Sequence, residues 1–298
     1  QKWTLFPYTT LFRSVSSIRN IGRCIKSAGL DLDGITLEPL ASANAVLSHE
    51  EKEAGVALID IGGGTTDLAI FKDGIIRHTA VIPFGGNVIT EDIKEGCSII
   101  EKQAELLKVK FGSAWPGENK ENEIVSIPGL RGRDPKEISL KNLSKIINAR
   151  TVEIIEQVYL EIKNYGHEEQ KKKLIAGIVL TGGGSQLKHL KQLVEFVTGM
   201  DTRVGYPNEH LAGDTDKNVT SPLYATAVGL VMDGLSKIEK NNIENTEFEN
   251  SDDESEVSET TVENNSEEIE KKTEKKIKRE SFLDKLTKNL QDFLDNAE

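Results

Sequence analysis

The stretch that decides the fold runs from residue 56 to residue 71 and reads VALIDIGGGTTDLAIF. It opens with an apolar run, VALIDI, of the kind found in strands buried on both faces of a sheet. Glycines placed directly after such a strand let the backbone approach a ligand closely and offer unobstructed amide donors. A carboxylate at the strand end suits a hydrated magnesium ion that bridges phosphates. The predicted binding residues of this first glycine turn are Asp60, also the predicted metal ligand, with Gly62, Gly63, Gly64, Thr65 and Thr66.

A second glycine turn, LTGGGSQL, occupies residues 180–187 and again follows a buried strand and precedes a predicted helix. That arrangement presents backbone amides and a helix start to an anion or an adenosine. The chain lacks GxGxxG with a later acidic residue and lacks GxxxxGK[ST], so neither a dinucleotide site nor a P-loop is predicted. One glycine turn alone equally serves a tight hairpin, and the pair carries the nucleotide hypothesis. The predicted contacts here are Gly182, Gly183, Gly184 and Ser185.

Hydrophobic periodicity predicts an α/β chain with an antiparallel start and a helical insertion. Strands are expected at 35–40, 56–61, 68–71, 75–82 and 176–181, with a hairpin or loop excursion at 123–140. Helices are expected at 15–30, 41–51, 86–97, 98–112, 143–166, 185–199 and 225–235.

Charge and composition exclude several classes of protein. No apolar run reaches the roughly 18–20 residues of a membrane-spanning helix. The two cysteines, Cys24 and Cys97, are too few for a disulfide scaffold. The net charge of -12 arises in residues 241–270, which hold twelve acids and no Lys or Arg; removing these from the 49 acids leaves 37, equal to the number of bases. Without a basic excess, no nucleic-acid partner is predicted.

The first residues do not read as native protein. The string TLFPYTTLFRS, residues 4–14, resembles the in-frame translation of a sequencing adapter. We therefore expect residues 1–14 to be a non-native leader, and the natural protein to begin further upstream.

The C-terminal segment separates into a linker and a helix. Residues 236–280 are polar, acidic and then basic, and we expect them to be disordered. Residues 281–298, SFLDKLTKNLQDFLDNAE, form an amphipathic helix whose apolar face spans about 120°. Its uses include lying in a membrane interface, docking into a partner groove and docking back onto its own domain. The predicted membrane-facing residues are Phe282, Leu283, Leu286, Leu290, Phe293 and Leu294.

Taken with the sequence between them, the two turns resemble the second half of an actin-like (ribonuclease H-like) ATPase. This class includes actin, Hsp70 chaperones and sugar kinases. Within that class the chain is most similar to the bacterial cell-division FtsA family. The strings that carry this resemblance are LEPLASANAVL, LIDIGGGTTDLAIFKDG, HTAVIPFGGNVITEDI, QAELLKVKFG and GIVLTGGGSQLKHL.

The resemblance implies a domain organisation. Residues 15–54 would end the first lobe, residues 55–85 and 174–235 would form the phosphate- and adenosine-binding core of the second lobe, and residues 86–173 would be an inserted helical subdomain. The family's first phosphate loop and small extra domain would lie upstream. Glu105 and Lys108, one helical turn apart, would contact adenine and ribose, although a solvated surface ion pair is the alternative.

The resemblance also implies a function. ATP and Mg²⁺ would favour actin-like self-assembly, and the last helix would fix the filaments to the anionic cytoplasmic face of the inner membrane at the division site. The inserted subdomain would bind the C-terminal peptide of FtsZ. Hydrolysis would be slow at most, with nucleotide acting as a switch. The alternative is an Hsp70-like chaperone ATPase or another actin-fold protein of the pilus-assembly, cell-shape or kinase type.

Overall fold

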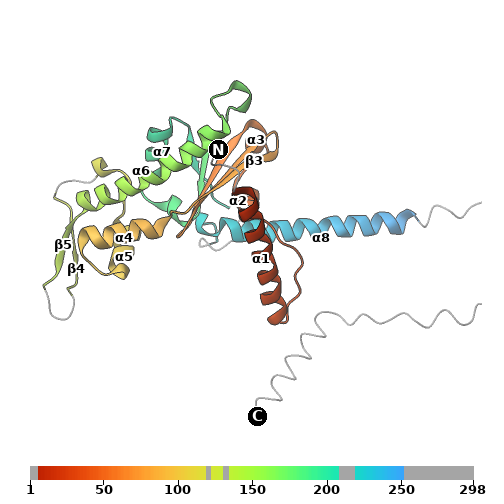
Figure 1. Ribbon diagram of the computed structural model, residues 1–298, viewed down its shortest axis with the longest axis horizontal. Coiled ribbons are helices and arrows are strands. Elements are labelled where there is room, and N and C mark those ends of the chain that lie inside the picture. Colours follow the sequence, from red (N-terminus) through yellow and green to blue (C-terminus); the bar gives the residue numbers. More distant parts are fainter. Residues whose placement is uncertain (1–5, 119–121, 130–133, 208–218, 252–298) are drawn as a thin grey trace, which may run out of the picture. The chain divides into compact units, whose positions relative to one another are not determined.

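The computed structural model describes residues 6–118, 122–129, 134–207 and 219–251 (Figure 1). Its helices are α1 (Phe6–Ser27), α2 (Glu38–Val46), α3 (His49–Ala54), α4 (Gly86–Cys97), α5 (Glu101–Phe111), α6 (Leu140–Tyr165), α7 (Leu190–Thr198) and α8 (Ala225–Ser251). Its strands are β1 (Val56–Ile61), β2 (Thr66–Lys72), β3 (Ile75–Ile82), β4 (Ile124–Ile127), β5 (Lys136–Ser139), β6 (Ile178–Thr181) and β7 (Thr202–Val204). Short 3₁₀ turns are η1 (Pro116–Glu118), η2 (Gln170–Lys172), η3 (Gly183–Gln186) and η4 (Pro222–Tyr224).

The central sheet has the strand order β3-β2-β1-β6-β7. Strands β1, β2 and β3 are antiparallel neighbours, whereas β6 and β7 continue the sheet in parallel with β1. Every residue of β1 and β6 is buried, which confirms the prediction of two-sided burial. The turn between β2 and β3 places Asp73 and Gly74 at positive φ, the backbone that a two-residue hairpin needs.

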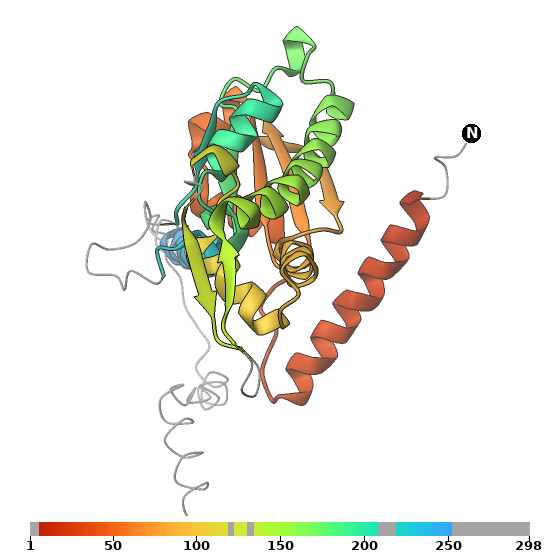
Figure 2. The same cartoon turned by 90° about the vertical axis from the view of Figure 1, so that its left-hand side faces the viewer.

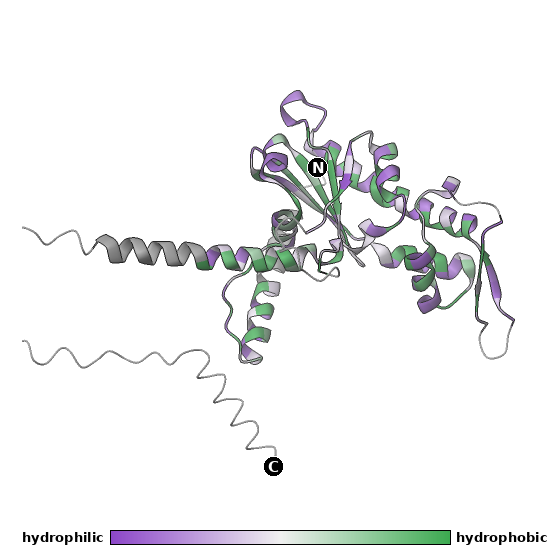
Figure 3. Ribbon diagram, turned by 180° about the vertical axis from the view of Figure 1, so that it is seen from behind, coloured by the Kyte–Doolittle hydropathy of each residue, from purple (hydrophilic) through white to green (hydrophobic). Residues whose placement is uncertain are grey.

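Helices cover both faces of this sheet. One face packs against α6 and α7 through Ile155, Val158, Leu190 and other apolar residues. The opposite face packs against α2 and α8, where small residues such as Ala43 and Ala225 let the helices lie close. Figure 3 shows the apolar strands enclosed between these layers. The result is a three-layer arrangement, and its α/β class is the one that the sequence predicts.

A second core forms beyond the end of the sheet, from α4, α5, the β4–β5 hairpin and the first half of α6. These elements face the viewer in Figure 2. Helix α6 belongs to both cores, because Leu143 and Ile147 pack in the second one whereas Val158 and Ile162 pack on the sheet. The predicted hairpin within 123–140 is confirmed, and the inserted segment is tied to the sheet layer by one continuous helix.

Four expectations differ from the structure. The helix expected at 41–51 is divided into α2 and α3, because Leu47 and Ser48 are extended and Ser48 caps the start of α3. Residues 35–37 form no strand, because Pro39 presets the backbone of a helix that begins at Glu38. The helix expected at 185–199 is interrupted, since His189 adopts a left-handed conformation with φ of 61° between η3 and α7. Helix α8 continues to Ser251, through residues 236–251 of the segment expected to be disordered; this stretch contains neither Pro nor Gly to stop a helix.

The rest of the expected linker and the amphipathic helix at 281–298 lie outside the described residues. The described α1 begins at Phe6, within the segment expected to be a non-native leader. Across the part of the chain that the structure describes, no helix combines the length and the apolar character needed to cross a membrane.

Candidate functional site

The two glycine turns meet at one edge of the sheet. Strands β1 and β6 are parallel neighbours, with Asp60 opposite Thr181, so the turns that follow them emerge side by side. A Cβ built at Gly182 would collide with Asp60 Oδ1 and with the Ile61 carbonyl oxygen. A Cβ at Gly184 would collide with the Ile61 side chain. The two turns therefore lie together at the carboxyl ends of parallel strands, where α/β proteins bind ligands.

The first turn leaves its backbone accessible. Gly63, Gly64 and Thr65 are exposed, and a Cβ at Gly64 would meet nothing within 4 Å. The Gly62 and Gly63 carbonyl oxygens accept from the Gly86 and Asn87 amides at the start of α4, at 2.9 and 2.8 Å. Within the described chain, no backbone carbonyl accepts from the amides of Gly63 and Gly64. These donors are available to an anion.

Acidic side chains gather at the base of this turn. Asp60 is 8% exposed, and burial raises the pKa of its carboxyl. A hydrogen bond from Ser42 lowers this pKa in part, and the charge of Asp67 raises it further. The pKa of Glu38 is also raised, first by burial and then by Asp67 and Asp60. Our reading of the sequence overlooked Glu38; its only signal was its place in the LEPLASANAVL string.

This acidic group fits a phosphate-bound cation better than a cation held by protein alone. Among the described residues, no group of three or more His, Cys, Asp or Glu is arranged to hold a metal ion. Mg²⁺ usually takes one or two carboxylates and completes its shell with phosphate and water. The buried Asp60 beside free amides therefore fits Mg²⁺ only together with a phosphate ligand.

Lys108 and Glu105 lie beside the first turn, but their charges are engaged. Lys108 Nζ lies 2.7 Å from Glu105 Oε2 and donates to the Gly86 carbonyl oxygen at 2.9 Å and to Thr90 Oγ1 at 2.8 Å. Burial alone would raise the pKa of Glu105, but hydrogen bonds from Lys108 and Thr90 hold it below its usual value. The pair therefore fastens α5 to the start of α4, and Glu105 keeps a half-exposed side chain that remains able to meet a ligand.

Two predicted hydroxyls point inward. Thr66 is fully buried and donates to the Phe84 carbonyl oxygen at 2.8 Å. Ser185 is buried and donates to the Gly182 carbonyl oxygen at 2.7 Å. Thr65, by contrast, is exposed and donates to Asp67 at 3.0 Å. Thr66 and Ser185 thus stabilise the turns themselves, and Thr65 is the hydroxyl placed at the surface.

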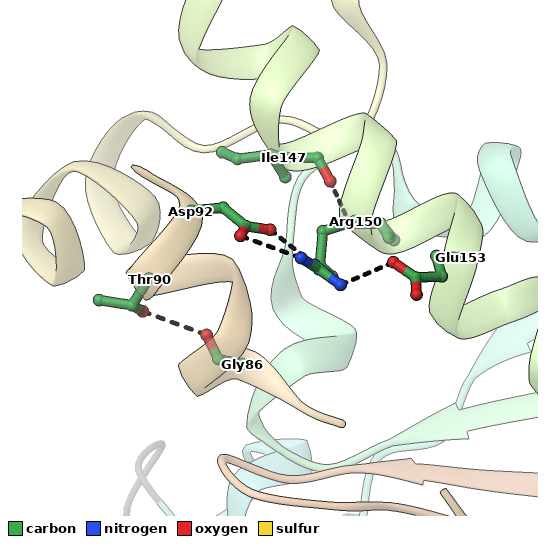
Figure 4. Close-up of polar contacts among 7 residues, drawn as sticks. Gly86, Thr90, Asp92, Ile147, Arg150 and Glu153 are labelled. Atoms are coloured by element: carbon green, nitrogen blue, oxygen red, sulfur yellow. Dashed lines mark hydrogen bonds and ion pairs between the residues drawn. The ribbon is translucent and has the colours of Figure 1, made fainter. Parts of the chain in front are cut away.

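A bidentate ion pair holds α4, the helix whose first amides bond to the first turn. Arg150 of α6 donates to both carboxylate oxygens of Asp92 on α4, at 2.6 and 3.1 Å, and to Glu153 at 2.7 Å (Figure 4). The hydroxyl of Thr90 lies 3.1 Å from the Gly86 carbonyl oxygen one turn earlier (Figure 4). Fork-shaped pairs of this kind restrict orientation as well as distance. Helix α4 is therefore held by α5 at its first residue, Gly86, and by α6 at Asp92 in its middle.

The second turn is also supported from outside the sheet. Its Gly182 amide donates to the Pro222 carbonyl oxygen at 3.2 Å, just before α8. After the turn, His189 Nδ1 lies 2.9 Å from Ser113 Oγ, and the Ala114 amide donates to the Lys188 carbonyl oxygen. The loop that follows α5 is thereby joined to the loop that follows β6.

A separate hollow of about 510 Å³ lies against α6 and α7. It is lined by Trp115, Pro116, Asn148, Val152, Glu156, Leu193, Phe196 and Val197, none of which was predicted to bind nucleotide.

Comparison with known proteins identifies the family. A family model described as cell division protein FtsA matches residues 57–229. FtsA of Pseudomonas aeruginosa is 41% identical over 75% of this chain and 52% of its own length. FtsA of Escherichia coli K12 is 36% identical over 74% of this chain and 55% of its own length. The chain spans about half the length of the curated relatives it matches.

Solved structures agree at the level of the fold. MreB5 of Spiroplasma citri bound to ADP aligns with a TM-score of 0.59 and 25% identity, covering 77% of this chain and 67% of its own. A PilM–PilN type IV pilus biogenesis complex aligns with a TM-score of 0.56 and 19% identity, covering 73% of this chain and 57% of its own. The α/β fold is actin-like, and the chain belongs to the FtsA family of cell division proteins.

Proposed function

We propose that this chain contributes one side of an ATP site to a cell-division protein. The observation that carries the proposal is the contact between the two glycine turns, with the free amides of Gly63 and Gly64 beside the buried Asp60. Backbone amides bind phosphate oxygens without a side chain in the way. The similar MreB5 has been solved with ADP and with AMPPNP, at 25% and 26% identity, which supports an adenine nucleotide.

Within this proposal each part has a role. Asp60 helps hold Mg²⁺, which neutralises phosphate charge when bound. Gly62, Gly63, Gly64 and Thr65 contact phosphates, Gly182–Gly184 approach the nucleoside, and Glu105 meets the ribose from α5. Lys108 places Glu105 through their 2.7 Å ion pair. No general base is assigned, so nucleotide acts chiefly as a switch and any hydrolysis is slow.

The proposed cellular role follows from the family. The protein assembles with copies of itself at the cytoplasmic face of the inner membrane, where its terminal amphipathic helix binds anionic lipid. It recruits the C-terminal peptide of FtsZ through the inserted helical segment. Two observations support this role: the chain belongs to the FtsA family, and residues 281–298 carry an apolar stripe that includes two phenylalanines. Cationic residues within 271–279 come just before this stripe, and together they favour an anionic membrane surface.

Two measurements test these proposals on protein expressed from the complete natural reading frame. Fluorescent ADP should bind in the presence of Mg²⁺ and be displaced by ATP; failure to bind contradicts the nucleotide proposal. Co-sedimentation with anionic vesicles should carry FtsZ into the pellet. Leu286→Asp should abolish pelleting because it places a charge in the apolar stripe, whereas Lys288→Gln, on the polar face, serves as the matched control. Equal pelleting of both variants contradicts the membrane proposal.

A further inference from the structure

Two hydroxyl side chains are joined to Asp60 by successive hydrogen bonds. Ser42 of α2 is fully buried, and its Oγ donates to Asp60 Oδ2 at 3.0 Å. The same Oγ lies 2.9 Å from Thr226 Oγ1, in the first turn of α8. A hydroxyl has one proton to donate and can accept others. Because Ser42 gives its proton to the carboxylate, Thr226 must donate to Ser42, and the chain of hydrogen bonds runs from Thr226 through Ser42 to Asp60.

Backbone packing between α2 and α8 fixes the length of this series of hydrogen bonds. A Cβ added at Gly229 of α8 would collide with the carbonyl oxygen of Ala41, the residue before Ser42. Ala225 and Val228 of α8 are buried in the same core as Ala43 and Val46 of α2. The two helices are therefore in direct contact on either side of the hydroxyl pair, and neither can withdraw without breaking that contact.

The second oxygen of Asp60 points elsewhere. Oδ1 lies where a side chain on Gly182 would be, facing the second glycine turn. With Oδ2 held by Ser42, rotation of the carboxylate is restricted and Oδ1 is directed to the place where the two turns meet. Groups that orient a metal-binding carboxylate in this way commonly matter almost as much as the ligand itself.

We propose that Ser42 and Thr226 are positioning residues that aim Asp60 at a nucleotide-bound Mg²⁺, and that through them helix α8 is joined to the site. This inference rests on the proposed nucleotide function. Neither residue touches the ligand: Ser42 acts through Asp60, and Thr226 acts through Ser42. The cation-dependent part of nucleotide affinity is thus set in part by α8, a helix that packs beside α2 on the same face of the sheet.

The test measures fluorescent ADP binding with saturating Mg²⁺ and again with EDTA, in the full-length protein and four variants. Ser42→Ala should weaken Mg²⁺-dependent binding about ten- to a hundredfold and leave the EDTA value unchanged. Thr226→Val should weaken it in the same direction but less. The double variant should lose less than the two single losses combined, because both act through one carboxylate. Thr198→Val removes a buried hydroxyl that donates to the Val194 carbonyl oxygen in α7, and it should change neither value.

Each other outcome decides between explanations. Binding that falls equally with and without Mg²⁺ would show general loosening and overturn the positioning role. Variants that bind as the wild type does would overturn the inference while leaving the nucleotide proposal intact. A wild-type protein that binds no ADP would refute the nucleotide proposal and the inference that rests on it. If Ser42→Ala does not fold, the half-buried Thr226→Val decides alone.

Discussion

The first and second glycine turns carry three consecutive glycines each, yet their glycines serve different needs. In the first turn Gly63 and Gly64 are exposed, and a Cβ on Gly64 would meet nothing. In the second, Gly182 is buried at φ of 80°, and a Cβ would strike Asp60 and the Ile61 backbone. The first turn uses glycine to leave space for a ligand. The second uses glycine because the end of β1, Asp60 and Ile61, already fills the space.

This difference separates stability from binding. Substitutions of Gly182 or Gly184 in the second turn should damage the folded state, since these glycines lie against Asp60 and Ile61. Substitutions in the first turn should spare the fold and weaken the ligand. The predictions that follow run from the largest expected effect to the smallest.

Gly182→Ala should lower the free energy of unfolding by about 2–6 kcal/mol. The backbone at φ of 80° and ψ of 171° is a conformation nearly confined to glycine and costs another residue about 1–3 kcal/mol, and overpacking adds about 1–3 kcal/mol. Urea denaturation measures the change. Gly183→Ala is the matched control, because its new methyl would meet only the flexible Leu223 side chain, at 3.1 Å. Equal effects of the two variants would show that the second turn is not packed as described.

Gly64→Ala should leave the free energy of unfolding within about 1 kcal/mol of the wild type, because the methyl points into open space. Affinity for ADP should fall about tenfold, or 1.4 kcal/mol, because the methyl obstructs the approach of phosphate to the backbone. Thermal melting and fluorescent ADP titration measure the two quantities on one sample. Unchanged affinity would mean that the exposed first turn is not where phosphate binds.

An ion pair between α3 and the edge strand β7 is sensitive to acid. Arg203 of β7 donates to both carboxylate oxygens of Glu51 in α3, at 2.7 and 2.6 Å. Burial alone would raise the pKa of Glu51, but hydrogen bonds from Arg203 and the Ser48 amide lower it below its usual value. A carboxyl group whose pKa is lower in the folded than in the unfolded state stabilises the protein at pH values above its unfolded-state pKa. That contribution is lost as the pH falls through the folded-state pKa.

Glu51→Gln should therefore cost less than about 1 kcal/mol at pH 7, given partial exposure of the pair, and nothing once the pH lies below the folded pKa. Denaturation of both proteins from pH 7 to about pH 3 gives the two curves. Curves that stay parallel across this range would show that the pair does not contribute through its charge. Glu168→Gln, at an exposed position, is the control.

A similarly small effect is expected after the second turn, at His189. His189→Ala keeps the left-handed backbone and loses the contact with Ser113, so it should cost about 1 kcal/mol. His189→Gly loses the same contact but relieves the backbone strain, so its unfolding free energy should lie close to the wild-type value. The difference between the two variants measures the strain; no difference would mean that this left-handed residue is unstrained.

Local pattern was enough to predict much of the fold. The apolar runs of β1 and β6, the hairpin around Asp73 and the amphipathic α6 all appear where periodicity placed them. The misses were local conflicts. Pro39 started a helix where a short apolar run suggested a strand, and His189 broke a helix without the glycine that usually marks such a break. Helix α8 continues beyond the apolar pattern that predicted it, because helix propensity alone does not indicate where a polar helix ends.

The candidate site divides in the same way. Gly62–Gly64 and Gly182–Gly184 could be named from sequence, because a glycine cluster after a buried strand has a physical reason that is visible locally. Sequence could not say that Thr66 and Ser185 would turn inward, or that Lys108 would be saturated by Gly86, Thr90 and Glu105. Partners of a hydroxyl or an ammonium depend on segments that reach it only after folding.

By itself the sequence determined the family, the two phosphate-type turns, the order of strands and helices in the chain, and the amphipathic character of residues 281–298. Tertiary structure alone decided that the turns touch, that Glu38 joins Asp60 and Asp67, and that Ser42 and Thr226 stand behind Asp60. The reason is that composition and periodicity act between near neighbours in the chain. Contacts between α2, β1, β6 and α8 arise only when the parallel strands align and the helices close on the sheet.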